Sequence, residues 1–166
     1  VMGMIDTSFS TMTPGARGVK RYTQVSDATI LGFEGSSAHQ LFKHFNFIQT
    51  IKYTYALTLD HEPLPGIAPF KWITSAGYSK KKFMLRTEME ASAAQKRINL
   101  LSGEDVTNGF VLLHIRTGYQ FPLGQMKLHV QAGVENILNK FYHEHNDWGN
   151  VPRSGRNVYT QLILHF

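Results

Sequence analysis

Hydrophobic and polar residues alternate with a period of two along most of this chain, which is the pattern of β-strands with one apolar and one polar face. The clearest alternation lies near the carboxyl end, where the apolar positions are Met126, Leu128, Val130, Ala132 and Val134. The last residues, 155–166, alternate in the same way and stop on the aromatic Phe166. The pattern predicts an all-β protein.

About eight strands are expected, counting a short apolar stub at residues 1–5, which is consistent with the length of the chain. The other strands are expected at 28–40, 45–57, 70–78, 83–91, 111–121, 126–135 and 158–166. In the second of these, Ile48 and Gln49 interrupt the alternation. Short turns near 43, 80 and 123 separate some strands, and long polar or Pro-rich loops separate others, at 6–27, 58–69, 95–108 and 137–155.

Alternating short and long connections are typical of antiparallel up-and-down hairpins, and outer-membrane barrels place short turns at one end and long loops at the other. If the carboxyl end is periplasmic, all three short turns lie on that side and the long loops face outside. A soluble lipocalin-like barrel gives the same alternation with its apolar face inside. The membrane barrel is favoured because long charged side chains lie beside glycine on the polar face and aromatic residues gather at strand ends: Tyr53, Tyr55, Trp72, Tyr78, Tyr119, Phe121 and Phe166.

Composition narrows the function. No apolar run approaches the ~20 residues of a spanning helix, and the absence of cysteine leaves no disulfide, thiol nucleophile or thiolate metal site. The formal charge of +5 is scattered along the chain, so no nucleic-acid partner is expected. No Ser-His-Asp order, carboxylate pair or phosphate-binding glycine loop stands out, so neither an enzyme nor a cofactor is predicted. With eight histidines, an outer-membrane hydrolase is the enzymatic alternative.

A family resemblance rests on an ordered set of segments. Residues 132–142 read Ala-Gly-Val-Glu-Asn-Ile-Leu-Asn-Lys-Phe-Tyr, and a loop with His143 and His145 follows. The chain then reads Val-Pro-Arg-Ser-Gly-Arg-Asn over 151–157 and enters its last strand. Upstream, 22–34 resembles a strand entry and 62–69 a Pro-rich loop of the same family. Together with the terminal phenylalanine, these segments resemble TonB-dependent outer-membrane receptors over nearly the whole chain.

The resemblance implies that residues 1–166 are the carboxyl-terminal portion of a 22-stranded, plugged barrel. It further implies uptake of a scarce ligand, most often an iron chelate such as a siderophore, with haem, cobalamin, copper or glycans as other possibilities. The expected partners are outer-membrane lipid, the plug domain, TonB and the barrel assembly machinery. Residues 1–5 do not form a signal peptide and are expected to be the tail of an incomplete strand.

Without a plug, this polypeptide is not expected to transport by itself. It could be a truncated gene product, a fragment or a complete small barrel. The alternative functions are therefore a stand-alone small outer-membrane barrel, acting as an anchor or adhesin, and a soluble ligand-binding barrel. Deletion of strands in this way changes the function but not the expected location in the bacterial outer membrane.

The longest carboxyl-side loop carries the candidate ligand contacts. His143, His145 and Asp147 could contact an extracellular metal chelate or bind a metal directly, because imidazole and carboxylate are metal ligands, and Trp148 lies beside them. The competing interpretation is an exposed polar loop without a ligand. Met89 and Met126 fall on apolar positions and are expected to face lipid rather than to bind copper.

Three further sets of residues complete the expectations. The positions expected to face the lumen, where they pair charges and touch a plug, are Lys71, Arg86, Glu88, Glu90, His114, Arg116, Lys127, His129 and Glu135. The family-motif positions with structural roles are Gly133, Glu135, Asn136, Pro152, Gly155, Arg156 and Asn157. The barrel-closing strand is expected to present Leu162, Leu164 and Phe166.

Overall fold

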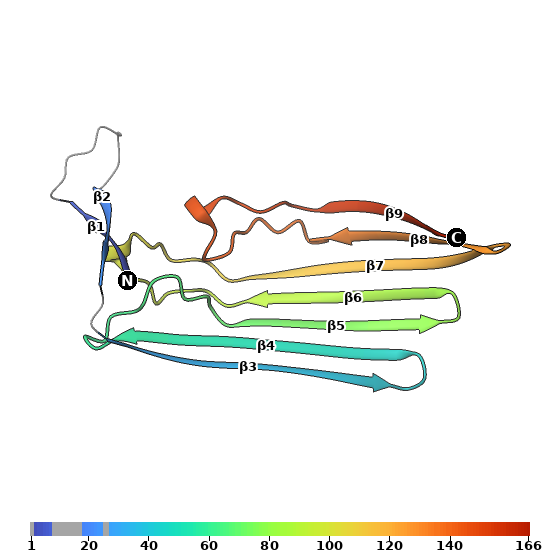
Figure 1. Cartoon of the computed structure of the whole chain (residues 1–166), viewed down its shortest axis with the longest axis horizontal. Helices are drawn as coiled ribbons and strands as arrows, with labels where there is room; N and C mark the ends of the chain where they lie inside the picture. Colours follow the sequence, from blue (N-terminus) through green and yellow to red (C-terminus); the bar gives the residue numbers. More distant parts are fainter. Residues whose placement is uncertain (1, 8–17, 25–26) are drawn as a thin grey trace.

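A computed structural model of the chain describes residues 2–7, 18–24 and 27–166, without the side chains of Met2 and Trp148. These residues form nine strands and two short 3-10 segments (Figure 1). The elements are β1 (Met2–Asp6), β2 (Val19–Thr23), β3 (Ala28–Leu41), β4 (Phe45–Thr58), β5 (Lys71–Lys80), β6 (Phe83–Ser92), η1 (Leu100–Ser102), β7 (Phe110–Leu123), β8 (Met126–Glu135), η2 (Trp148–Asn150) and β9 (Asn157–His165). Among the described residues, no helix is long and apolar enough to cross a membrane.

Seven strands form one antiparallel sheet in the order β3-β4-β5-β6-β7-β8-β9, so each strand pairs with its neighbour in sequence. This confirms the all-β, up-and-down architecture, and the strand boundaries agree with the alternation to within a few residues. β3 and β4 pair along their full lengths, from Ala28↔Thr58 to Leu41↔Phe45. Within the described part of the chain, β3 and β9 are the two edges of this sheet, and it does not close on itself.

Two expectations at the amino end are corrected. The loop expected over 6–27 contains a strand, β2, which pairs antiparallel with β1 from Met2↔Thr23 to Asp6↔Val19. The stub is therefore a strand, but it belongs to a separate two-stranded sheet rather than to the main one. The polar composition of β2 concealed it, because a hairpin exposed to water needs backbone pairing but no apolar face. Residues 8–17 and 25–26 lie outside the described part of the chain.

The connections alternate as predicted. Short turns join β3 to β4, β5 to β6 and β7 to β8, and two of them contain Lys81 and Gly124 at positive φ of 53° and 64°. Long connections span 59–70, 93–109 and 136–156. Figure 1 shows the three turns and the carboxyl end at one end of the sheet, with the long connections at the other. We call the latter the long-loop end.

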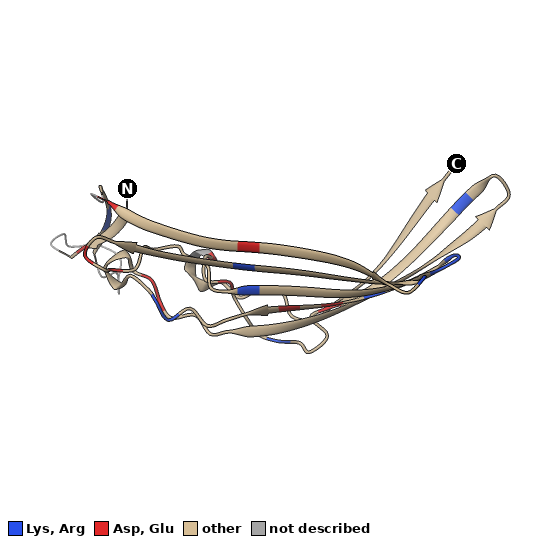
Figure 2. Cartoon of the chain, turned by 90° about the horizontal axis from the view of Figure 1, so that it is seen from below, with Lys and Arg blue, Asp and Glu red and all other residues tan. Residues whose placement is uncertain are grey.

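The apolar side of the sheet has no protein layer against it. Large apolar side chains on that side are exposed, for example Phe33 at 58%, Val158 at 69% and Leu162 at 66%. Figure 2 shows the strands as one curved layer. A soluble barrel would bury this face in its interior, so the exposure argues against the soluble alternative.

Burial of hydrophobic residues occurs instead on the polar side. Among the described residues, the buried hydrophobic side chains are Ala56, Phe110 and Leu112. All three occupy even-numbered positions in strands whose even-numbered residues include Lys52, Glu88 and Arg116 on the neighbouring positions of the polar face. They lie near the long-loop end, where the connections fold over that face and shield it from water.

Candidate functional site

A cluster of charged side chains lies on the polar face where β6, β7 and β8 run together. Register places Arg86 opposite Arg116 and Glu88 opposite His114. With Glu90, Glu135 and Tyr159, these residues line a hollow of about 130 Å³. We call this set the polar-face cluster: Arg86, Glu88, Glu90, His114, Arg116, Glu135 and Tyr159. Because acidic and basic groups alternate across neighbouring strands, the cluster balances much of its own charge.

His114 links the polar-face cluster to the β8–β9 loop, residues 136–156. Its Nδ1 accepts a hydrogen bond from the Asn136 backbone N–H at 3.4 Å. Its Nε2 is buried and has no hydrogen-bond partner among the described residues. A second hollow of about 390 Å³ begins at His114 and Glu135 and continues beneath Pro152 and Gly155. The two hollows together give the polar side a continuous recess under this loop.

Asn136 anchors the beginning of the β8–β9 loop. It is 3% exposed and has a positive φ of 48°, a conformation that asparagine adopts more readily than most residues. Its side-chain oxygen accepts from the Lys140 N–H at 2.8 Å, and its amide nitrogen donates to the Lys140 carbonyl at 2.9 Å and to the Ser154 carbonyl at 3.3 Å. One side chain thus joins the outgoing and returning limbs of the loop.

The return of the loop to β9 uses the remaining motif residues. The Arg156 N–H donates to the Asn139 Oδ1 at 2.9 Å, and the Arg156 Nε donates to the Ile137 carbonyl at 2.9 Å. A Cβ at Gly155 would lie 2.6 Å from that Asn139 oxygen, so glycine permits the close approach. Asn157 opposes Glu135 in the sheet and donates to its carboxylate at 3.4 Å.

Gly133 makes room for an aromatic ring on the next strand. It lies opposite Tyr159, and a Cβ at Gly133 would approach the Tyr159 ring to 2.5 Å. The ring therefore lies across the glycine, and its hydroxyl accepts a hydrogen bond from the Arg116 Nε at 2.6 Å. The motif glycine thereby positions one member of the polar-face cluster against another.

An ion-pair bridge fastens the β8–β9 loop to the sheet. The Lys71 Nζ lies 2.8 Å from a Glu90 oxygen and 2.8 Å from a Glu144 oxygen. Beside it, the Tyr142 ring packs on Phe110 with centroids 4.5 Å apart. Burial raises the pKa of the Tyr142 hydroxyl. The loop is held over the polar side by one charged and one aromatic contact.

The three candidate metal ligands do not converge. The His145 side chain is 3% exposed, with Nδ1 2.9 Å from the Thr107 hydroxyl and Nε2 3.3 Å from a Glu104 oxygen. His143 lies near the Glu144 carbonyl instead, with 3.2 Å from its Nδ1 to that oxygen. Within the described residues, no group of three or more His, Cys, Asp or Glu side chains could hold a metal ion. The side chain of Trp148 lies outside the described part of the chain.

Asp147 is occupied by an arginine. Arg153 donates to both of its carboxylate oxygens, from Nε at 2.8 Å and from a terminal nitrogen at 2.7 Å. These hydrogen bonds lower the pKa of Asp147 to about 2 and raise the pKa of Arg153. The paired carboxylate closes the tip of the β8–β9 loop, a role that spacing in the sequence does not reveal.

A second polar network, which sequence reasoning missed, joins the other long loops. Glu104 accepts the Gly66 N–H at 2.6 Å through one oxygen and the Asn99 N–H at 2.7 Å through the other. The first of these oxygens also faces His145. Thus Glu104 ties the β4–β5, β6–β7 and β8–β9 connections together. A single glutamate in an aperiodic polar segment gives no signal of such a role.

The remaining expected positions lie apart from the polar-face cluster. Lys127 opposes His165 near the short turns, and the His129 Nδ1 lies 3.4 Å from the Gln131 side-chain nitrogen. On β9, Leu164 is 47% exposed, and Phe166 follows the strand fully exposed. No role in barrel closure is tested by these positions.

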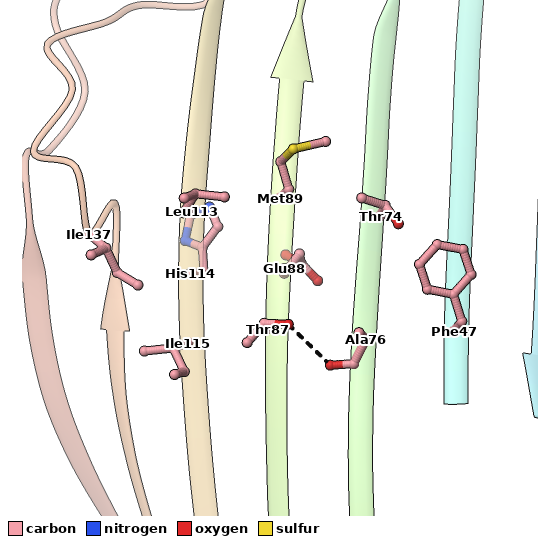
Figure 3. Close-up of a pocket in the computed structure, with 10 residues that line it drawn as sticks. All are labelled: Phe47, Thr74, Ala76, Thr87, Glu88, Met89, Leu113, His114, Ile115 and Ile137. Atoms are coloured by element: carbon pink, nitrogen blue, oxygen red, sulfur yellow. Dashed lines mark hydrogen bonds between the residues drawn. The ribbon is translucent and has the colours of Figure 1, made fainter. Parts of the chain in front are cut away.

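The apolar face carries a hollow of its own, of about 240 Å³ (Figure 3). Short side chains at Thr74, Ala76 and Thr87 leave space between the larger Phe47 and Met89. The Thr87 hydroxyl donates to the Ala76 carbonyl at 3.4 Å, so its polar group turns away from the hollow. Met89 therefore lines an apolar depression.

Comparisons with known proteins support the membrane assignment. No family model and no curated protein sequence matches the chain. Among solved structures, the chain is similar to one described as "Copper transporter OprC", with a TM-score of 0.70 and 25% identity. The match covers 81% of this chain and 23% of that one, so the chain spans about a quarter of its length. The fold is that of an outer-membrane β-barrel, and the chain is located in the bacterial outer membrane.

Proposed function

We propose that this chain forms the carboxyl-terminal part of the barrel of a TonB-dependent outer-membrane transporter for a scarce metal, taken up bare or as a chelate. The observation that carries the proposal is a single sheet with an exposed apolar face and a charged, loop-covered polar face. Such a sheet is stable only if lipid covers the first face and a polar lumen receives the second. The similarity to a copper transporter supports the transport role.

The open sheet favours part of a larger barrel over a stand-alone small one. In the described residues, the backbone groups along the outer edges of β3 and β9 have no strand partner. Unpaired edges are costly in hydrocarbon, because no water is present to bind them. Further strands would complete the wall, and we infer that the plug domain and TonB act with the complete protein.

The polar-face cluster and the β8–β9 loop are the parts proposed to meet the lumen and the ligand path. Arg116 and Glu88 give this surface both signs of charge, and the recess beneath Pro152 and Gly155 opens beside them. A mixed surface of this kind suits contact with a polar plug and passage of a polar metal complex. His143 remains the candidate loop contact of the original set, since His145 and Asp147 are held by protein partners.

Copper is the first ligand candidate because the similar structure is described as a copper transporter, and an iron chelate is the second because of the motif resemblance. Uptake of ⁶⁴Cu and of a ⁵⁵Fe-siderophore should be measured in cells that produce the complete protein containing this chain. Accumulation of either metal that a protonophore abolishes is the expected result. Accumulation equal to that of cells lacking the protein, or insensitive to the protonophore, would overturn the proposal.

A further inference from the structure

We propose that the apolar side of the long-loop end binds a phosphate-bearing lipid of the outer leaflet, with Arg97 and Lys96 receiving the phosphate. The inference rests on the proposed function, which places the apolar face against lipid and the long loops outside the cell. It concerns a site remote from the polar-face cluster, on the opposite side of the sheet.

Aromatic side chains form the floor of this site. Tyr53 and Tyr55 share the apolar side of β4 with Ile51, which pairs with Trp72 of β5. Phe70, two residues before Trp72, accepts a backbone hydrogen bond from Ala93 at 2.9 Å. A hollow of about 230 Å³ lies between Tyr53, Phe70 and the segment 93–97. Its position, where the apolar strands meet the long loops, matches the aromatic girdle of a membrane barrel.

Arg97 folds back over this aromatic floor. Its guanidinium carbon lies 4.3 Å from the centroid of the Tyr55 ring and 5.7 Å from that of Tyr53. A terminal nitrogen donates to the Tyr53 hydroxyl oxygen at 3.0 Å, which leaves the hydroxyl proton of Tyr53 available to another acceptor. Stacking fixes the plane of the guanidinium while its remaining N–H groups point away from the rings.

The two cations have no acidic partner in the described part of the chain. No carboxylate there lies within 4.0 Å of the charged nitrogens of Arg97 or Lys96, and none lines the hollow. Lys96 is exposed beside Arg97. Two cations at a membrane interface without a counter-charge are complementary to an anionic head group.

The segment that presents these cations is held in place. Gln95 is 4% exposed, and its backbone exchanges hydrogen bonds with Thr107 at 2.9 and 3.1 Å. Its side chain donates to the Ile67 carbonyl at 2.6 Å and accepts from the Arg97 N–H at 3.2 Å. Arg97 is therefore positioned before any lipid arrives, which reduces the entropic cost of binding.

Phosphate is the head-group chemistry that fits best. A guanidinium presents a planar fork that matches phosphate oxygens, and a neighbouring ammonium adds charge without geometric demand. The Tyr53 hydroxyl supplies a third donor. The acyl chains would lie along the exposed apolar side chains of the strands, where Phe33 and Leu31 are 58% and 63% exposed. A free phosphate ion would use the cations but not this apolar surface.

The test is native mass spectrometry of the complete protein in detergent with purified lipid A as the probe. We expect Arg97→Gln to lower lipid A affinity about tenfold, the size of a lost charged hydrogen bond. Tyr53→Phe should lower it less, and Arg97→Lys should restore part of the loss. Lys82→Gln is the matched control, because it removes an exposed cation at the short-turn end. If Arg97→Gln fails to fold, the exposed Lys96→Gln carries the same test.

Several outcomes would overturn the inference. Equal affinity of Arg97→Gln and the parent for lipid A would do so, as would equal binding of dephosphorylated lipid A. Inorganic phosphate that displaces lipid A at matched concentration would identify a free-ion site instead. Preference for phosphatidylglycerol over lipid A would place the site in the other leaflet. Metal uptake separates the two proposals, because loss of lipid binding with uptake retained contradicts only this one.

Discussion

Asn136 offers the sharpest perturbation of the loop that covers the polar face. Replacement by alanine removes three side-chain hydrogen bonds, two with Lys140 and one with Ser154. It also places a Cβ-bearing residue without a compensating amide at a φ of 48°. We expect the strands to persist and the β8–β9 loop to open more often.

The magnitude follows from these contacts. Three hydrogen bonds at about 1 kcal/mol each, plus about 1 kcal/mol for the left-handed backbone, give about 4 kcal/mol. Water reaches part of the loop, because Lys140 is exposed, so about 2–4 kcal/mol is expected. In exchange rates this corresponds to about 30-fold to about 1000-fold. Asn136→Gly keeps the backbone conformation and should lose about 1 kcal/mol less.

Hydrogen exchange measured by mass spectrometry is the appropriate assay. The reporting amides are those of Arg153 and Arg156, which donate to the Tyr142 carbonyl and the Asn139 side chain within the loop. Asn108→Ala is the control, since Asn108 is exposed in the β6–β7 connection. Unchanged protection at both reporters in Asn136→Ala would refute the anchoring role, as would equal acceleration by Asn108→Ala.

Three further changes test other contacts. Gly133→Val should displace the Tyr159 ring and lower the free energy of unfolding by about 1–3 kcal/mol, measured by thermal denaturation in detergent. Lys71→Met should free Glu144 and raise loop exchange by about tenfold, because two half-buried ion pairs are lost together. For Asp147, the pKa lowered to about 2 means that its contribution is complete above the unfolded pKa of 3.8 and disappears as pH falls through about 2. After allowance for exposure this is about 1 kcal/mol or less, and Asp147→Asn should abolish the acid-induced rise in loop exchange over that range.

Each of these predictions has a matched comparison. Ala132→Val adds the same methyl groups on the apolar face and should leave the denaturation temperature within a few degrees of the parent. Lys82→Met removes a cation remote from the loop and should not alter loop exchange. If these controls behave like their partners, the contacts described here do not determine the effects.

The strands could be predicted from sequence because a sheet with unlike faces imposes a period of two on every strand. β8 shows this best, since lipid-side and lumen-side residues alternate without exception from Met126 to Glu135. The rule failed for β2, where both faces of a short hairpin are polar. It was also weak at Ile48 and Gln49, which the structure places on the polar and apolar faces beside Ser75 and Thr74.

The loop contacts could not be predicted, because their partners are distant in sequence and follow no period. Lys71 and Glu144 are 73 residues apart, and His145 and Glu104 are 41 apart. An exposed metal ligand and a buried histidine with a protein partner look identical in sequence. The motif glycine and asparagine were recognised by resemblance, whereas their physical roles required the Tyr159 ring and the Lys140 backbone to be located.

The central claim is that this sheet is a membrane wall with its apolar face against lipid, and site-directed spin labelling along β8 tests it most directly. The chain contains no cysteine, so single cysteines from Lys127 to Glu135 can be labelled without background. In liposomes, the account predicts that oxygen accessibility peaks at Leu128, Val130, Ala132 and Val134, while a water-soluble nickel reagent reaches the intervening positions. Equal aqueous access at both sets, or oxygen maxima at the polar positions, would contradict it.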